Sequence, residues 1–342
     1  MQCTPRSLEK IGFESIRRHA MGEVGTPPGR DWVERLAPLS VPHVLSERLA
    51  QGVELQRLLQ SGESVPLERL DEIRDDLRKV KAEGSILSLQ ALGEIRRHTA
   101  AARQLRTWLV RQSEALPSYA EVAGAMHELK SLEKAISTAV TENGDLRDDA
   151  SPELRTIRNR MRRTRQELRG ALDRMLRKLR SNGMAPDEGP TIRNGRLVLP
   201  VLAEHKRRLD GMLHDVSATG RTAYIEPAAA VALNNDVRQL EVEEAREIER
   251  ILRELTNRVR AEIPRLLDNE HAIGQVDGLR ALQRAGSHWS GSFPMRSTDG
   301  SIRLMGARNP HLLLRAASAE VEARLRAFSQ SAKPAEAPEP IV

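Results

Sequence analysis

Residues 191–236, TIRNGRLVLPVLAEHKRRLDGMLHDVSATGRTAYIEPAAAVALNND, are the part of the chain whose pattern most clearly predicts β-structure. Asn194-Gly195 separates two short runs, and such a dipeptide tolerates the positive φ that a two-residue hairpin turn requires. A second hairpin is expected from Gly211–Ser217, through a turn at Thr219-Gly220, to Arg221–Glu226. Because a few short strands bury little surface alone, the flanking segments are expected to cover this sheet.

Long amphipathic helices are expected on both sides of the sheet. The first covers about residues 152–182, with Ser151 as its cap and apolar residues at alternating steps of three and four. The second covers about residues 228–262 and has the same spacing. Two such helices joined by a compact sheet are expected to pack antiparallel. The sequence therefore predicts a mainly α fold, in which a helical core domain bears a long antiparallel two-helix arm with a small antiparallel β clamp at its tip.

The rest of the chain is read from its helical spacing and its breaks. Apolar residues recur at helical steps through the first third of the chain, with breaks at 25–29 and 64–66. A short strand is expected at Ser301–Met305. The predicted division is a helical core (1–125), a connecting helix with the first arm helix (126–183), the β clamp (184–227), the second arm helix (228–262), a return to the core (263–315) and a linker toward a domain outside this sequence (316–342).

Composition narrows the class of protein. Charged residues make up 30% of the 342 residues and aromatic residues 2%, which suits long charged helices better than a large α/β enzyme core. The single cysteine, Cys3, excludes an internal disulfide framework and indicates a reducing compartment. No apolar stretch approaches the length of a membrane span, so we expect a cytoplasmic protein without a membrane partner.

Charge is concentrated on the predicted helix at 152–182. This segment carries eleven basic residues against three acidic ones, which leaves a net charge of +8. One interpretation is that these arginines pair with glutamates of the second helix and fix its orientation. The cations outnumber those glutamates, however, so some are expected to face outward toward a polyanionic partner. The glutamates in question are Glu241, Glu243, Glu244, Glu247 and Glu249.

Sequence motifs for catalysis are missing from these residues. There is no G-x-x-x-x-G-K-[ST] phosphate loop, no G-x-S-x-G elbow and no H-E-x-x-H zinc motif. His214, Asp215 and Ser217 are residue types found in hydrolases, but neighbours on one strand alternate faces and cannot form a relay. We therefore predict no catalytic residue, no metal site and no cofactor in this chain.

The quoted stretch resembles the MutS-two subfamily of the MutS mismatch-repair ATPases. The family pattern is roughly T-I-R-N-G-R-x-V-L-P-V-x-A-E, then G-x-x-H-D-x-S-A-x-G-x-T-x-x-I-E-P, then L-N-N-x-x-R-x-L, and residues 191–240 match most of it without gaps. A weaker resemblance extends over almost the whole chain, through Leu8–Ile11, Gly84–Leu87 and Ala150–Leu154.

The resemblance implies the N-terminal core, lever and clamp of such a protein. The family's ATPase domain and its Smr nuclease domain are then expected to lie outside this sequence, and ATP and Mg²⁺ are implied only for that ATPase domain. In the family, two protomers form a homodimer through their ATPase domains, and their arms surround nucleic acid. The implied partners are double-stranded or branched DNA, with suppression of recombination, or stalled and collided ribosomes contacted through rRNA.

The predicted nucleic-acid contacts form two sets. At the tip they are Arg193, Asn194, Arg196, Lys206, Arg207, Arg208 and Arg221, and along the arm they are Arg162, Arg163, Arg165 and Arg169. Two alternatives remain open. In the first, Asn194 serves the turn and makes no ligand contact, and in the second, residues 206–208 form an ordinary solvated loop. The alternative function is a stand-alone coiled-coil interaction module or scaffold that partners full-length MutS-like proteins.

Overall fold

The structure is a computed structural model of the chain and describes residues 4–297 and 299–314. It is mainly helical and contains one four-stranded antiparallel sheet, which confirms the predicted fold class at that level. The described residues divide into two compact units. The first is drawn from 4–75, 94–133, 261–297 and 299–314, and the second from 76–93 and 134–260. Within the described ranges, no helix is both long and apolar enough to cross a membrane.

The first unit is a bundle of helices that encloses a large apolar core. Leu55, Leu105, Tyr119 and Ile273 are buried in this core and come from four separate elements. Its elements are α1 (Pro5–Lys10), α2 (Phe13–Gly22), α3 (Pro27–Glu34), α4 (Pro42–Gln60), most of α6 (Leu89–Arg111), η1 (Pro117–Tyr119), α7 (Ala120–Ala125) and the last part of α10 (Ala228–Ser287). Two further helices, α5 (Arg74–Val80) and α8 (Lys130–Ala139), begin in this unit and end in the second.

Helix α3 packs closely on α10 in the first unit. A Cβ at Gly278 would overlap the ring of Trp32, so the missing side chain permits this close approach. The carboxylate of Asp277 accepts hydrogen bonds from the Thr26 backbone N–H at 2.8 Å and from its hydroxyl at 2.6 Å. Thr26 in turn caps α3, so the expected break at 25–29 contains the start of a helix.

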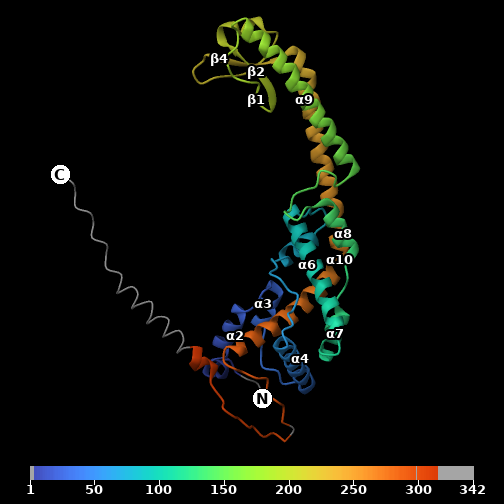
Figure 1. Cartoon of the computed structure of the whole chain (residues 1–342), viewed down its shortest axis with the longest axis vertical. Helices are drawn as coiled ribbons and strands as arrows, with labels where there is room; N and C mark the ends of the chain where they lie inside the picture. The colour runs from blue at the N-terminus through green and yellow to red at the C-terminus, as the bar shows by residue number, and fades with distance from the viewer. Residues whose placement is uncertain (1–3, 298, 315–342) are drawn as a thin grey trace, which may run out of the picture. The chain divides into compact units, whose positions relative to one another are not determined.

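The second unit contains the sheet and two paired helices (Figure 1). Its elements are α9 (Pro152–Ser181), β1 (Thr191–Arg193), β2 (Arg196–Leu202), η2 (Ala203–Arg208), β3 (Gly211–Val216), β4 (Thr222–Pro227) and the first part of α10. As predicted, Ser151 caps α9 by accepting a hydrogen bond from the Leu154 N–H at 2.9 Å. The Ser151 hydroxyl also donates to Glu247 of α10 at 2.6 Å.

Contacts along α9 and α10 show that the two helices run antiparallel. Near the start of α9, Ile157 and Met161 cluster with Leu240 of α10. Near its end, Leu172 clusters with Ala230, which lies in the first turn of α10. Advancing along α9 therefore means going backward along α10, as the two apolar seams predicted.

Two expectations about the return segment were wrong. The second helix does not end at residue 262, because α10 continues through Pro264 to Ser287 as one helix. A proline inside a helix costs about 3 kcal/mol or more, but burial of the flanking Ile263 and Leu266 offsets that cost. Residues 301–305 form no strand, and the predicted linker at 316–342 lies outside the described residues.

A buried histidine–glutamate pair lies in the first unit. His98 of α6 is 2% exposed, and its Nδ1 contacts the carboxylate of Glu270 on α10. Its Nε2 hydrogen-bonds to the Asp71 carbonyl at 2.7 Å. Burial by itself lowers the pKa of His98, but the hydrogen bond and the charge of Glu270, with Asp71 and Glu94, raise that pKa above its ordinary value.

The raised pKa of His98 predicts a pH dependence of stability. Its stabilising effect is fully present below the unfolded-state pKa and is lost as the pH rises through the folded-state pKa. We expect the urea midpoint of the first unit to fall as the pH is raised from about 5.5 to about 9, and His98→Gln to remove that part of the decrease. Trp32, Trp108 and Trp289 are the chain's three tryptophans and all lie in this unit, so tryptophan fluorescence follows its unfolding.

The matched control is His43→Gln, which replaces an exposed histidine on α4 and should keep the wild-type pH profile. An unchanged pH profile in His98→Gln would contradict the assignment.

Candidate nucleic-acid interface

The sheet has the strand order β1-β2-β4-β3, and all neighbouring strands are antiparallel. Asn194 and Gly195 have φ values of 50° and 74°, so the first hairpin turn is the one that the sequence predicted. One face of the sheet, represented by Leu199 and Ile225, packs on Leu172 of α9. This packing fixes the sheet to the end of α9.

The sheet curls toward its opposite face, and side chains of its two edge strands, β1 and β3, meet there. Arg193 of β1 forms an ion pair with Asp215 of β3 at 3.1 Å, although two strands separate them in the sheet. The Arg193 guanidinium also lies 4.3 Å from the ring centroid of Tyr224 on β4. Asn194, in the turn after β1, also connects the two edges of the sheet, because its side-chain amide donates to the His214 carbonyl of β3 at 3.2 Å. Arg193 and Asn194 therefore make structural contacts within the sheet.

Glu226 of β4 is the centre of a buried polar network on this face. The residue is 1% exposed and accepts hydrogen bonds from Arg196 at 2.7 Å, His214 at 2.8 Å and Asn234 at 2.9 Å. Burial favours the protonated form of this carboxyl, but these three donors lower its pKa below the ordinary value. The network joins β2, β3 and β4 to the first turns of α10.

Asn234 and Arg196 extend this network to the backbone and to a second α10 side chain. The Asn234 side chain accepts from the Leu197 N–H at 3.0 Å and donates to the Leu197 carbonyl at 3.1 Å. Arg196 donates to Asn235 at 2.7 Å. Arg196, predicted as a nucleic-acid contact, is half-buried and donates to two acceptors of the fold, Glu226 and Asn235.

The hydrolase-like residue types of β3 do not form a relay. His214 is the extra residue of a β-bulge, since Leu213 pairs with Ile225 and Asp215 with Tyr224. The bulge directs the His214 side chain to Glu226, whereas Asp215 binds Arg193. Ser217 accepts from the Thr222 N–H at 3.0 Å and belongs to the turn.

Four of the predicted cations are exposed and lie outside the strands of the sheet. The η2 segment ends in Lys206, Arg207 and Arg208, and all three residues are exposed. Arg221, which immediately precedes β4, is exposed too, and its carbonyl accepts from the Ala203 N–H at 2.9 Å. That hydrogen bond ties the beginning of η2 to Arg221. Within the described part of the chain, none of the four side chains has an ion-pair partner.

Ion pairs with α10 use several of the α9 arginines. Arg158 pairs with Glu244 at 2.7 Å, and Arg165 pairs with Glu241 at 2.9 Å. A longer pair joins Arg160 to Glu243 at 4.0 Å. Arg–Glu ion pairs therefore connect α9 to α10, as the first interpretation of the charge pattern predicted.

Six cations of α9 remain exposed and without an ion pair among the described residues. They are Arg155, Arg163, Arg169, Arg174, Arg177 and Lys178. Of the four α9 residues predicted as contacts, Arg163 and Arg169 belong to this set. Arg165 does not, and Arg162 lies 3.7 Å from Asp148. Sequence reasoning did not select Arg174 and Arg177.

Helical spacing could have identified these two arginines. Arg174 and Arg177 follow Arg163 by eleven and fourteen residues, which are close to three and four turns of an α-helix. All three residues therefore share one face of α9, and that face lies opposite the apolar seam of Leu168, Leu172, Leu176 and Leu179.

Known proteins are similar to this chain over most of its length. Over 308 residues, 89% of this chain, the sequence is 33% identical to Endonuclease MutS2 of Geobacillus sp. (strain WCH70). It is 35% identical over 272 residues, 80% of the chain, to Endonuclease MutS2 of Symbiobacterium thermophilum, and 31% identical over 309 residues, 89% of the chain, to that of Halalkalibacterium halodurans. The chain is MutS2-like. It spans 39%, 34% and 39% of these three relatives.

No family model matches the sequence. The motif letters that carry the MutS2 likeness have a structural explanation in this sheet. Arg196, His214, Glu226 and Asn234 are all specified positions of the pattern, and all four meet in the buried network. The MutS2-like motif therefore specifies how the sheet folds onto α10, and the exposed cations around it are a separate feature.

Replacing Glu226 by glutamine tests the role of this network. The substitution keeps the shape of the side chain but removes the charge that faces Arg196 and His214, so we expect a loss of about 1–3 kcal/mol in stability. Hydrogen exchange of the β2 and β4 amides, followed by mass spectrometry, should become faster. The matched control Glu204→Gln changes an exposed glutamate on η2 and should leave exchange unchanged. Equal protection of β2 and β4 in wild type and Glu226→Gln would contradict a structural role.

Proposed function

We propose that the second unit of this MutS2-like chain binds the phosphate backbone of a double-stranded nucleic acid. The exposed, unpaired cations of α9 and η2 in the described chain carry this proposal. Long basic side chains without carboxylate partners release condensed counterions when they meet phosphates, and this release drives binding that does not depend on base sequence. Figure 1 shows α9 leading directly into the sheet, so one continuous stretch of chain bears both groups of cations.

Within that proposal, α9, the first part of α10 and the sheet act as lever and clamp. The seam and the Glu226 network make this assembly stiff, which suits a surface that recognises the shape of a duplex. Branched or duplex DNA and ribosomal RNA offer the same phosphate chemistry. We place catalysis, ATP, Mg²⁺ and dimer formation in parts of the MutS2 proteins that this chain does not match.

The decisive experiment replaces the three exposed cations of η2. In the variant Lys206→Ala, Arg207→Ala, Arg208→Ala, the affinity for duplex DNA should fall uniformly across unrelated sequences. The slope of log affinity against log salt should flatten by about one unit for each phosphate that the variant no longer neutralises. Fluorescence anisotropy with a labelled duplex, a labelled four-way junction and purified ribosomes separates the candidate partners.

The matched control removes three other arginines of the same unit. Arg250, Arg253 and Arg258 on α10 are exposed, but each forms an ion pair with a glutamate, at 2.8, 2.6 and 3.0 Å respectively. Their triple alanine variant loses the same formal charge and should keep the wild-type salt slope. Equal effects of the two triple variants would show that only net charge matters. Salt-independent behaviour of the wild type would instead favour a protein-interaction scaffold.

A further inference from the structure

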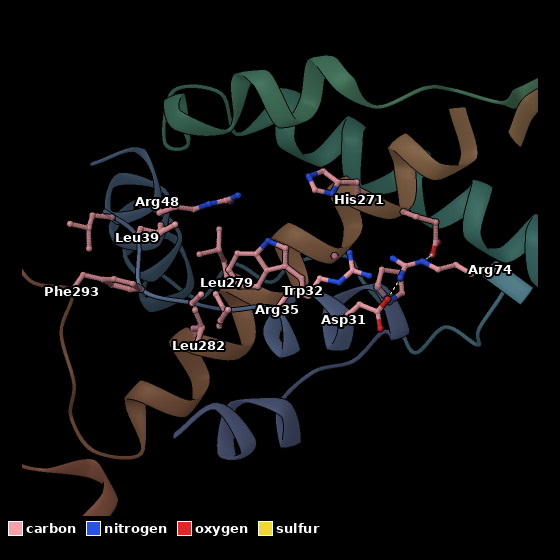
Figure 2. A pocket seen from close by; sticks show the side chains of 16 residues that line it. Asp31, Trp32, Arg35, Leu39, Arg48, Arg74, His271, Leu279, Leu282 and Phe293 are labelled. Atoms are coloured by element: carbon pink, nitrogen blue, oxygen red, sulfur yellow. Dashed lines mark ion pairs between the residues drawn. The ribbon is translucent and has the colours of Figure 1, made fainter. Parts of the chain in front are cut away.

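The first unit contains a cavity of about 460 Å³ between α3, α4 and α10 (Figure 2). This volume lies within the range of small-molecule sites. Its apolar wall includes Trp32, Leu39, Leu279, Leu282 and Phe293. A cavity with this lining can accept an apolar body of moderate size.

The charged groups of the cavity divide into a neutralised set and a free set. Arg74 contacts Asp31 and lies 3.8 Å from Glu270, so its charge is compensated. Arg35 and Arg48 also line the cavity, and neither has an ion-pair partner among the described residues. The compensated arginine lies on one side of the cavity, and Arg48 reaches in from α4 (Figure 2).

Arg48 is held at the edge of the apolar wall. Its guanidinium carbon lies 5.4 Å from the Trp32 ring centroid, and its Nη1 donates to Gln51 at 3.2 Å. Burial lowers the pKa of this guanidinium, against the opposing effects of Glu47 and Tyr119. The group stays cationic near neutral pH. A partly desolvated cation beside an aromatic ring is well suited to an anion that carries an apolar group.

Glu270 adds an unused hydrogen-bond acceptor to the lining. Its Oε1 contacts His98, whereas its buried Oε2 lies 3.8 Å from the Arg74 Nε and has no hydrogen-bond partner within the described residues. A ligand N–H or O–H could give this buried oxygen the hydrogen bond that it lacks.

We propose that this cavity binds a small amphipathic anion, whose apolar body lies against Trp32 and Leu282 and whose single carboxylate or phosphate meets Arg48. A ligand that also carries an N–H or O–H donor can satisfy Glu270. This site is independent of the proposed nucleic-acid interface, because it uses other residues in the other unit.

The probe for this site is 8-anilinonaphthalene-1-sulfonate, which combines an apolar ring system, an N–H donor and one anionic group. We expect saturable fluorescence enhancement with one probe per chain. Arg48→Gln should weaken probe binding about tenfold, because it removes a charge-assisted hydrogen bond. Octanoate and adenosine monophosphate then compete for the site, and the better competitor distinguishes a carboxylate ligand from a phosphate ligand.

Charge changes at Leu39 keep the test decisive if Arg48→Gln affects folding. Leu39 is 45% exposed and lies outside any helix or strand, so it tolerates polar replacements. Leu39→Asp should weaken probe binding and Leu39→Lys should strengthen it, each about threefold. Arg111→Gln, an exposed position at the end of α6, should change nothing. Non-saturable binding, failure of both competitors, or equal affinity in the two Leu39 variants would overturn the proposal.

Discussion

One buried carboxylate joins the sheet of the second unit to α10. Glu226 lies under the curled sheet, where three donors from β2, β3 and α10 keep it ionised. Because an uncompensated charge in such a place is costly, the donors and the carboxylate depend on one another. The bulge at His214 and the side chain of Asn234 both supply hydrogen-bond donors to Glu226. They bring an edge strand and a helix to the same acceptor.

The cations of the second unit fall into two classes with different consequences. Those near α10, such as Arg158 and Arg165, have carboxylate partners that fix the antiparallel pairing. Those on the opposite face of α9, such as Arg163 and Arg177, and those ending η2 are exposed and unpaired in the described chain. The first class stabilises the pairing of the helices, whereas the second is available to a polyanion. Net charge alone does not separate the two classes, since every residue in both carries one positive charge.

Much of the fold followed from local chemistry. The cap at Ser151, the turn at Asn194-Gly195 and the apolar seams predicted α9, the first hairpin and the helix pairing, because each signal acts over a few residues. The failures depended on distant partners. Pro264 did not end α10, because packing outweighed its cost, and the hydrogen bond from Arg196 to Glu226 was not foreseen, because the two residues are thirty positions apart in sequence. Likewise, the cavity beside Trp32 is lined by residues that lie far apart in the sequence and that no short motif connects.

The central claim is that the unpaired arginines, and not the paired ones, touch nucleic acid. The most direct measurement is modification of arginines with phenylglyoxal in the presence and absence of a saturating DNA duplex, read out by mass spectrometry. We expect protection of Arg163, Arg177, Arg207 and Arg208, with unchanged modification of Arg253 and Arg258. Protection confined to the ion-paired arginines of α10, or no protection at all, would contradict the claim.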